Sequence, residues 1–302
     1  MTRAKGLIGL SAALMLASPA GSAPGESDIG MTVEQSRPAA WHLDQHRKLA
    51  DTLAALKPQR PGVVDAYVIA IGLDADPVFG REAAEASRVL SRRYDAVGRT
   101  VLLSVGPGAA NPAVPSGTPG HLATSLAAVA GKMDLKEDVL ILFTTSHGGP
   151  VNGLNYQDGA FGYGMIGPKR LASLIDGAGI KRRMVVISAC FSGIFVPVLA
   201  SESSLIVTAA SDSTASFGCG ANNDWTYFGD AFINTALRKP QGTEAAAKDA
   251  FALIEGWEKK ETLMPSLPQL SVGARVKDWL VPLEARMPKV TTPRVGVSPA
   301  GG

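Results

Sequence analysis

The 302-residue chain is poor in cysteine and in aromatic residues, with two cysteines and 6% Phe, Trp and Tyr. Two cysteines cannot build a disulfide-rich scaffold, so the fold must depend on a buried apolar core. The chain also lacks an excess of charge, because 29 basic and 27 acidic residues give a net charge of +2. Nucleic acid and anionic membranes attract strongly basic surfaces, and we therefore predict neither as a partner.

Several motifs with established chemistry are also missing. The sequence contains no Cys-x-x-Cys pair and no acidic cluster in the chain next to His147, so metal binding is not predicted. The Gly-Pro-Gly turn at residues 106–108 is a poor phosphate loop, since proline has no N–H to donate. Gly-x-Ser-x-Gly, the nucleophile turn of serine hydrolases, does not occur. We predict that the protein has no metal and no cofactor.

The N-terminus has the pattern of an export signal. Arg3 and Lys5 precede an apolar stretch over residues 7–17, and small residues follow up to Ala23. We expect residues 1–23 to be a signal peptide, with cleavage after Ala20 preferred. A retained anchor is the second alternative, because the apolar run is shorter than the roughly 20 residues that span a bilayer. The mature chain is predicted to be periplasmic or secreted, without stable membrane insertion, and its oligomeric state stays open.

Three segments follow the predicted signal peptide. Residues 24–62 are expected to form an extension with one helix, on which Leu43, Leu49 and Leu53 are apolar and which the prolines at 58 and 61 end. Residues 63–281 are predicted to be the main domain. Residues 282–302 are expected to be a proline-rich surface tail, and the proline-rich loop over residues 106–119 is expected to lie on the surface as well.

Apolar strand-like runs alternate with amphipathic segments throughout the main domain. Strands are predicted at residues 63–71, 100–105, 138–145, 183–189 and 204–210, with a weaker candidate at 269–272. Helices are predicted near residues 81–94, 117–132, 168–178, 191–200, 226–237 and 243–259. Continuous apolar strands separated by helices are typical of a sheet covered on both faces. The sequence predicts an α/β protein, a three-layer α/β/α sandwich with a mostly parallel sheet of about six strands.

Two of these strands end in residues suited to catalysis. The run at residues 139–145 leads into Ser146-His147-Gly148-Gly149, and the run at 184–189 leads into Cys190-Phe191-Ser192-Gly193. Reactive groups converge at the carboxyl ends of parallel strands, where a packed scaffold fixes exposed side chains. A thiol becomes a useful nucleophile when an imidazole takes its proton. The glycines after His147 leave backbone N–H groups uncovered, and with the N–H of Cys190 these can bind an oxyanion.

At these residues the chain resembles the legumain-like cysteine peptidases, the family of the asparaginyl endopeptidases and of the catalytic subunit of the GPI transamidase, which has a caspase-like fold. The matching pieces are the two strand-end motifs, the run at residues 206–210 leading into Ser216-Phe217-Gly218-Cys219, and Tyr227-Phe228-Gly229-Asp230. Order and spacing agree over roughly residues 64–237. The resemblance implies a cysteine-type endopeptidase that acts on peptide or protein substrates.

The resemblance also implies roles for single residues. His147 would be the general base, Cys190 the nucleophile, and the N–H groups of Gly148 and Cys190 the oxyanion hole. The primary specificity pocket would contain Arg81, Ser188, Ser216 and Asp230. An arginine and an aspartate that face each other suit an asparagine side chain.

Two departures from the family pattern bear on these roles. Ser188 stands where the family has a glutamate two residues before the nucleophile, so the pocket has one negative charge fewer and aspartate becomes an alternative to asparagine. Val78-Phe79-Gly80 replaces the asparagine that orients the histidine in the family, so His147 is expected to act in a dyad. Cys219 matches a family cysteine that is not the nucleophile, which favours free thiols over a Cys190–Cys219 disulfide.

Three alternatives to a hydrolase stay open at this point. A transpeptidase would use the same acyl-enzyme with an amine in place of water. A catalytically inactive caspase-like binding module would have no need of both His147 and Cys190. A thiol-redox protein would pair Cys190 with Cys219 reversibly.

Overall fold

The computed structural model describes Met1 and residues 30–300, apart from residues 36, 107, 109 and 110. Apart from Met1, the predicted signal peptide therefore lies outside the described residues. Within the described part of the chain, no helix combines the length and apolar character needed to cross a membrane.

A six-stranded sheet forms the centre of the molecule, with the strand order β10-β9-β8-β4-β2-β3. Its strands are β2 (Ala66–Gly72), β3 (Thr100–Ser104), β4 (Val139–Thr145), β8 (Arg183–Ser188), β9 (Ser204–Thr208) and β10 (Gln269–Val272). The first five run parallel, and β10 pairs antiparallel with β9 at one edge. Every residue of β2, β4, β8 and β9 is buried, which explains why these strands are continuous apolar runs.

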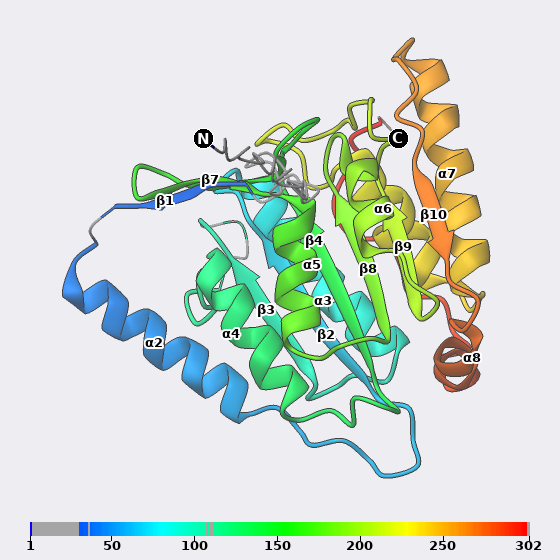
Figure 1. Ribbon diagram of the computed structural model, residues 1–302. Helices are drawn as coiled ribbons and strands as arrows, with labels where there is room; N and C mark the ends of the chain where they lie inside the picture. The colour runs from blue at the N-terminus through cyan, green and yellow to red at the C-terminus, as the bar shows by residue number, and fades with distance from the viewer. Residues whose placement is uncertain (2–29, 36, 107, 109–110, 301–302) are drawn as a thin grey trace.

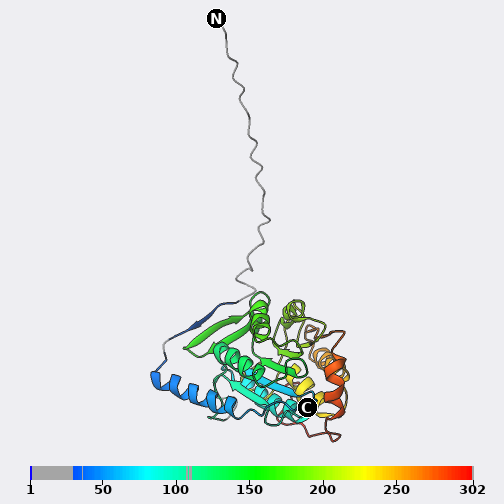
Figure 2. The same ribbon diagram turned by 60° about the horizontal axis from the view of Figure 1, so that its bottom comes forward.

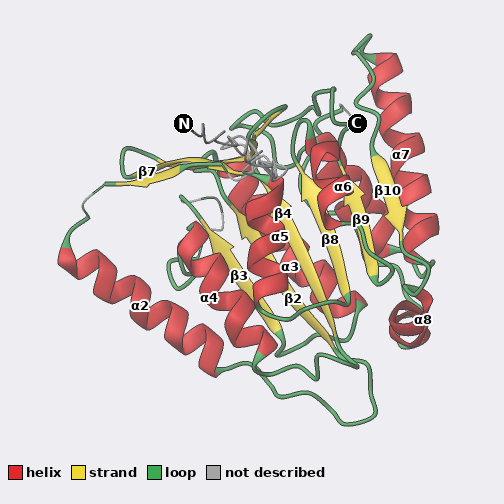
Figure 3. Cartoon of the chain, in the orientation of Figure 1, coloured by secondary structure: helices red, strands yellow, loops and turns green. Residues whose placement is uncertain are grey.

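Helices cover both faces of this sheet (Figure 3). One face packs against α3 (Pro77–Arg93), α7 (Thr243–Lys260), α8 (Lys277–Ala285) and the π-helix η2 (Gly229–Thr235). The other packs against α2 (Ala39–Ala54), α4 (Pro119–Ala130), α5 (Pro168–Gly177) and α6 (Val196–Leu199). Alternate residues of β4 enter the two cores, Ile141 and Phe143 on one side and Leu140 and Leu142 on the other. The predicted three-layer α/β/α sandwich is confirmed.

A second, smaller sheet was not predicted. It contains β1 (Thr32–Glu34), β7 (Gly162–Ile166), β6 (Gly153–Asp158) and β5 (Gly148–Gly149) in that order, all antiparallel. These strands are short and rich in glycine and polar residues, so they carry little apolar pattern. Because β5 begins directly after His147, this sheet fixes the backbone on the far side of the histidine.

Three predicted segments differ from the structure. The helix expected over residues 191–200 is a 3₁₀ turn, η1 (Ser192–Phe195), followed by the short α6. The helix expected over 226–237 is η2 followed by the 3₁₀ turn η3 (Ala236–Arg238). The tail expected from residue 282 is wrong in its first part, because α8 continues to Ala285 and buries Leu283 together with Trp279.

The helix predicted for the N-terminal extension is α2, and it lies across the molecule from α8 (Figures 1 and 2). Leu49 and Leu56 are buried against the main domain, whereas Leu43 is half exposed. The extension is therefore packed onto the sandwich through one end of its apolar face.

Candidate active site

Three neighbouring parallel strands bring their carboxyl ends together at one edge of the sheet. In the register of the sheet, Gly72 of β2 pairs with Thr145 of β4, which pairs with Ser188 of β8. His147 and Cys190 each lie two residues beyond this row. The segment after β2 supplies Asp74 and Asp76. Residues far apart in the chain thus meet because they follow adjacent strands.

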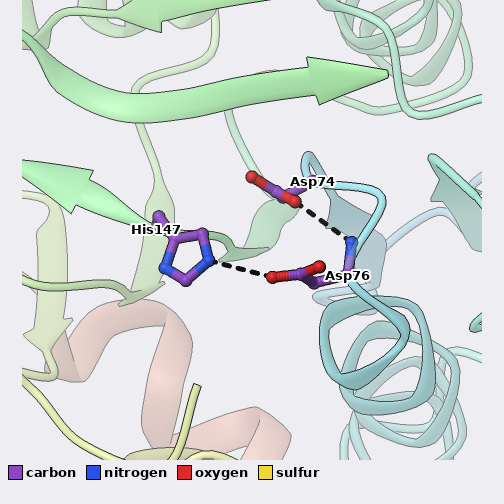
Figure 4. Close-up of side chains that lie close together, drawn as sticks. All are labelled: Asp74, Asp76 and His147. Atoms are coloured by element: carbon purple, nitrogen blue, oxygen red, sulfur yellow. Dashed lines mark hydrogen bonds and ion pairs between the residues drawn. The ribbon is translucent and has the colours of Figure 1, made fainter. Parts of the chain in front are cut away.

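The imidazole of His147 has an acidic partner that the sequence analysis missed. Its Nε2 lies 3.2 Å from Oδ2 of Asp76, which occupies the N-cap position of α3 (Figure 4). Asp74 accepts a hydrogen bond from the backbone N–H of Asp76 at 3.0 Å and one from the Asn155 side chain at 2.7 Å. The expected His147 dyad is therefore wrong in this structure, since a carboxylate orients the ring. The ring of Phe79 packs edge-on against the imidazole, with centroids 4.9 Å apart.

Asp74, Asp76 and His147 also offer ligand atoms within 4.8 Å of one another. The sequence analysis found no acidic group near His147, because these residues are more than seventy positions away in the chain. The hydrogen bonds just described already engage all three side chains. We read this cluster as the network that holds the histidine.

Cys190 follows β8 in a tight backbone turn. Phe191, the next residue, has a φ of 56°, an unusual left-handed conformation for a bulky side chain and a frequent feature of functional turns. The Cys190 Sγ lies 3.2 Å from the backbone N of Ser216 and 3.4 Å from its carbonyl oxygen. Burial raises the pKa of the Cys190 thiol, an effect that the Ser216 backbone partly opposes. The resting group is thus a protonated thiol.

The second cysteine contacts the histidine. The hydrogen bond between His147 and Cys219 is the main reason that the pKa of His147 is raised to about 9, with burial opposing it and Asp76 adding to it. Both cysteines are free thiols in this structure. The imidazole of His147 thus interacts with both Cys219 and Asp76. The sequence analysis did not predict the contact with Cys219.

Gly148 packs directly on the turn of Cys190. A Cβ at Gly148 would lie 2.1 Å from the carbonyl oxygen of Cys190, so only glycine allows the two backbones to touch. The carbonyl of His147 accepts a hydrogen bond from the N–H of Asn155 at 2.9 Å, which makes Gly148 and Leu154 the next, non-hydrogen-bonded pair of the β5–β6 ladder. The N–H of Gly148 therefore points away from β6, as an oxyanion donor requires.

A small pocket adjoins the Cys190 thiol. It is lined by Ser146, His147, Ser188, Ala189, Cys190, Ser216, Phe217, Cys219 and Thr226. Of the predicted specificity residues, Ser188 and Ser216 are present here. The hydroxyl of Ser188 lies 3.2 Å from that of Thr226 at the buried end of the pocket. Thr226 is a lining residue that the sequence analysis missed.

The predicted pairing of Arg81 with Asp230 is not found. The guanidinium of Arg81 donates to the backbone carbonyls of Ala221 and Asn223, and its Nε lies 3.6 Å from Asp224. Asp230 is fully buried and accepts two hydrogen bonds from Arg294, at 2.7 and 2.9 Å. Arg81 is thus held by a surface loop, and the C-terminal segment neutralises Asp230.

Glu82, next to Arg81, is the other acid that the sequence analysis missed. Its carboxylate is fully buried and accepts hydrogen bonds from the hydroxyl of Thr145 and the backbone N–H of Thr226, both at 2.9 Å. The signal was available in the sequence: in the helix predicted near residues 81–94, Glu82 lies on the same face as Ala86 and Val89, which are buried, and an acid is rare on such a face.

A thiol, an imidazole and a carboxylate at neighbouring strand ends define the site of a cysteine hydrolase. A family model described as the Peptidase C13 family matches residues 123–274, half of the chain. The chain belongs to the Peptidase C13 family and is a cysteine peptidase. His147, Cys190, Cys219 and Asp230 lie within the matched residues, whereas Glu82 and the other residues of α3 precede them.

No curated protein sequence matches the chain. Among solved structures, the chain is similar to caspase-1 from Spodoptera frugiperda, with 12% sequence identity, a TM-score of 0.45, and coverage of 72% of this chain and 93% of that one.

Proposed function

We propose that this peptidase is an exported cysteine endopeptidase in which Cys190 is the nucleophile and His147 the general base. The observation that carries the proposal is that His147 and Cys190 follow the adjacent parallel strands β4 and β8 and line one pocket, while Asp76, in the segment after the neighbouring β2, contacts the imidazole. Export rests on the N-terminal sequence pattern alone. The pocket is proposed to bind the asparagine or aspartate side chain that precedes the cleaved bond.

The reaction proceeds in two halves. His147 takes the thiol proton of Cys190, and the thiolate attacks the peptide carbonyl carbon. The N–H groups of Gly148 and Cys190 stabilise the oxyanion that forms. The C–N bond then breaks as His147 gives the proton to the leaving amine, which leaves a thioester on Cys190. Water, deprotonated by His147, hydrolyses the thioester and restores the thiol.

The thioester itself provides the test of this proposal. A peptide library incubated with the enzyme and quenched in acid is expected to leave an acyl group on the tryptic peptide that contains Cys190, as detected by mass spectrometry. The structure places a competing thiol, Cys219, against His147. An acyl group on Cys219, or no cleavage of any library peptide, contradicts the proposal.

Cys219→Ser is expected to move the pH profile of cleavage. His147 must be neutral to accept the thiol proton, and its pKa of about 9 keeps it protonated at neutral pH. Activity of the wild type should therefore rise from pH 7 through pH 9. The substitution removes the main cause of the raised pKa, so the rise should occur at lower pH, in the direction of the usual value near 6.5.

Measurement of kcat/KM against pH for both proteins checks this expectation, and NMR titration of the His147 ring gives an independent readout. Asp76 still contacts the imidazole in the variant, so the pKa of His147 is expected to stay above its usual value near 6.5. A profile that falls between pH 7 and 9 would identify the imidazolium as the active form and would remove the general-base role.

A further inference from the structure

Glu82 lies directly behind the buried end of the pocket. It lies on α3, the helix that packs against β2 and β4, and its carboxylate hydrogen-bonds to the last residue of β4, Thr145, and the last residue of β8, Ser188. Its side chain has no exposed surface, and a Cβ at Gly229 would lie 2.1 Å from Oε2. The carboxylate is therefore enclosed, and glycine at position 229 makes room for it.

The groups around this carboxylate are all uncharged donors. Besides the hydroxyl of Thr145 and the N–H of Thr226, the side chains of Ser188 and Thr226 hydrogen-bond to it. Burial raises the pKa of the Glu82 carboxyl, and the hydrogen bonds from Ser188, Thr226 and Thr145 oppose this by favouring the charged form. Thr226 Oγ1 also accepts a hydrogen bond from the N–H of Gly229 at 2.9 Å, which leaves its proton free to point toward Glu82.

The hydroxyls of Ser188 and Thr226 lie 3.2 Å from each other, and both also hydrogen-bond to Glu82, whose ionised carboxylate is the stronger acceptor. Each hydroxyl has one proton and two lone pairs. When Ser188 and Thr226 donate their protons to Glu82, the oxygens that line the pocket present lone pairs to a substrate. An incoming side chain then meets acceptors, with a negative charge behind them.

We propose that Glu82 determines the specificity of the pocket through Ser188 and Thr226, so that the pocket binds a side chain that donates hydrogen bonds and excludes a carboxylate. This inference rests on the proposed function. It favours asparagine over aspartate as the residue before the cleaved bond. Glu82 contributes the negative charge that Ser188 lacks, from a different element of the fold. It touches no substrate and acts as a positioning residue.

Two matched peptides that differ only by asparagine or aspartate before the cleaved bond provide the test. The wild type is expected to have the higher kcat/KM for the asparagine peptide. Glu82→Gln removes the charge and places an N–H donor among the hydroxyls, so the asparagine-to-aspartate ratio should fall about tenfold or more. The ratio is measured on one preparation, so partial loss of folded protein cancels.

Two further variants complete the design. Glu85→Gln makes the same change one turn along α3, where Glu85 contacts Arg238 and Arg88, and it should leave the ratio at the wild-type value. Ser188→Ala keeps the charge of Glu82 and removes one acceptor from the pocket. It should lower the ratio mainly through a higher KM for the asparagine peptide, and it serves if Glu82→Gln does not fold.

Peptidyl electrophiles with asparagine or aspartate, which label Cys190 irreversibly, separate two kinds of failure. A wild type that neither electrophile labels removes the proposed function and the role of Glu82 with it. The role of Glu82 alone is overturned by either of two results. The first is an asparagine-to-aspartate labelling ratio that is unchanged in Glu82→Gln and Ser188→Ala, and the second is a wild type that prefers aspartate.

Discussion

Cys190→Ala is expected to lower kcat/KM for peptide cleavage by about 10⁴-fold or more, because it removes the sulfur atom that forms the acyl-enzyme. His147→Ala should lower it by about 10³- to 10⁴-fold, since partial burial raises the pKa of the Cys190 thiol above the usual value and the thiol then needs a base. Both variants should fold normally, because both side chains are partly exposed at the sheet edge. The measurement is cleavage of the best library peptide by each variant. Far-UV circular dichroism checks separately that each variant is folded.

Cys219→Ser is the matched control for the nucleophile. It removes the other thiol of the same pocket, and it should retain cleavage at its own optimal pH. The opposite pattern, with activity kept in Cys190→Ala and lost in Cys219→Ser, would exchange the roles of the two cysteines. Activity that survives in the Cys190→Ala/Cys219→Ser double variant would exclude thiol catalysis.

Arg294→Ala is expected to destabilise the protein by about 3 kcal/mol. The substitution leaves the fully buried carboxylate of Asp230 without its cation; because the Arg294 side chain is itself 47% exposed, the expected effect is at the lower end of the range for breaking a buried ion pair from one side. Asn234 still donates one hydrogen bond to Asp230 at 2.7 Å, which limits the loss. Urea unfolding followed by tryptophan fluorescence measures the change in the free energy of unfolding.

Two variants make this measurement specific. Asp230→Asn in the Arg294→Ala background removes the unpaired charge and should recover most of the lost stability. Arg275→Ala breaks an ion pair with Asp278 in which both side chains are about half exposed, and it should change stability by less than about 0.5 kcal/mol. An Arg294→Ala variant as stable as Arg275→Ala would show that the C-terminal segment does not neutralise Asp230.

Prediction from the sequence was most successful where a pattern is local. The buried strands β2, β4, β8 and β9 are continuous apolar runs, and each was predicted within a few residues. The smaller sheet was missed because its strands are short and polar, and they depend on pairing between segments distant in the chain. The helix α8 was missed because Pro282 lies inside it, although its apolar face buries Trp279 and Leu283.

The candidate site divides in the same way. His147, Gly148 and Cys190 were predicted because each follows its own strand and carries its signal in neighbouring residues. Asp76 was missed because its partner, His147, follows a different strand. Glu82 was missed because its partners, which include Thr145, lie on other elements of the fold. The expected pairing of Arg81 with Asp230 failed for a related reason: a motif shows which residues are present but not which partner reaches each of them.

By itself, therefore, the sequence determined the layered sheet and the two strand ends that carry the histidine and the thiol. Hydrophobic burial acts on every apolar residue in a run, so the run specifies the strand and the point where it ends. Only the tertiary structure decided which charged groups meet: Asp76 with His147, Arg294 with Asp230, and Glu82 with the pocket hydroxyls. Hydrogen bonds and ion pairs act over a few ångströms between single atoms, and the three-dimensional path of the chain alone brings those atoms together.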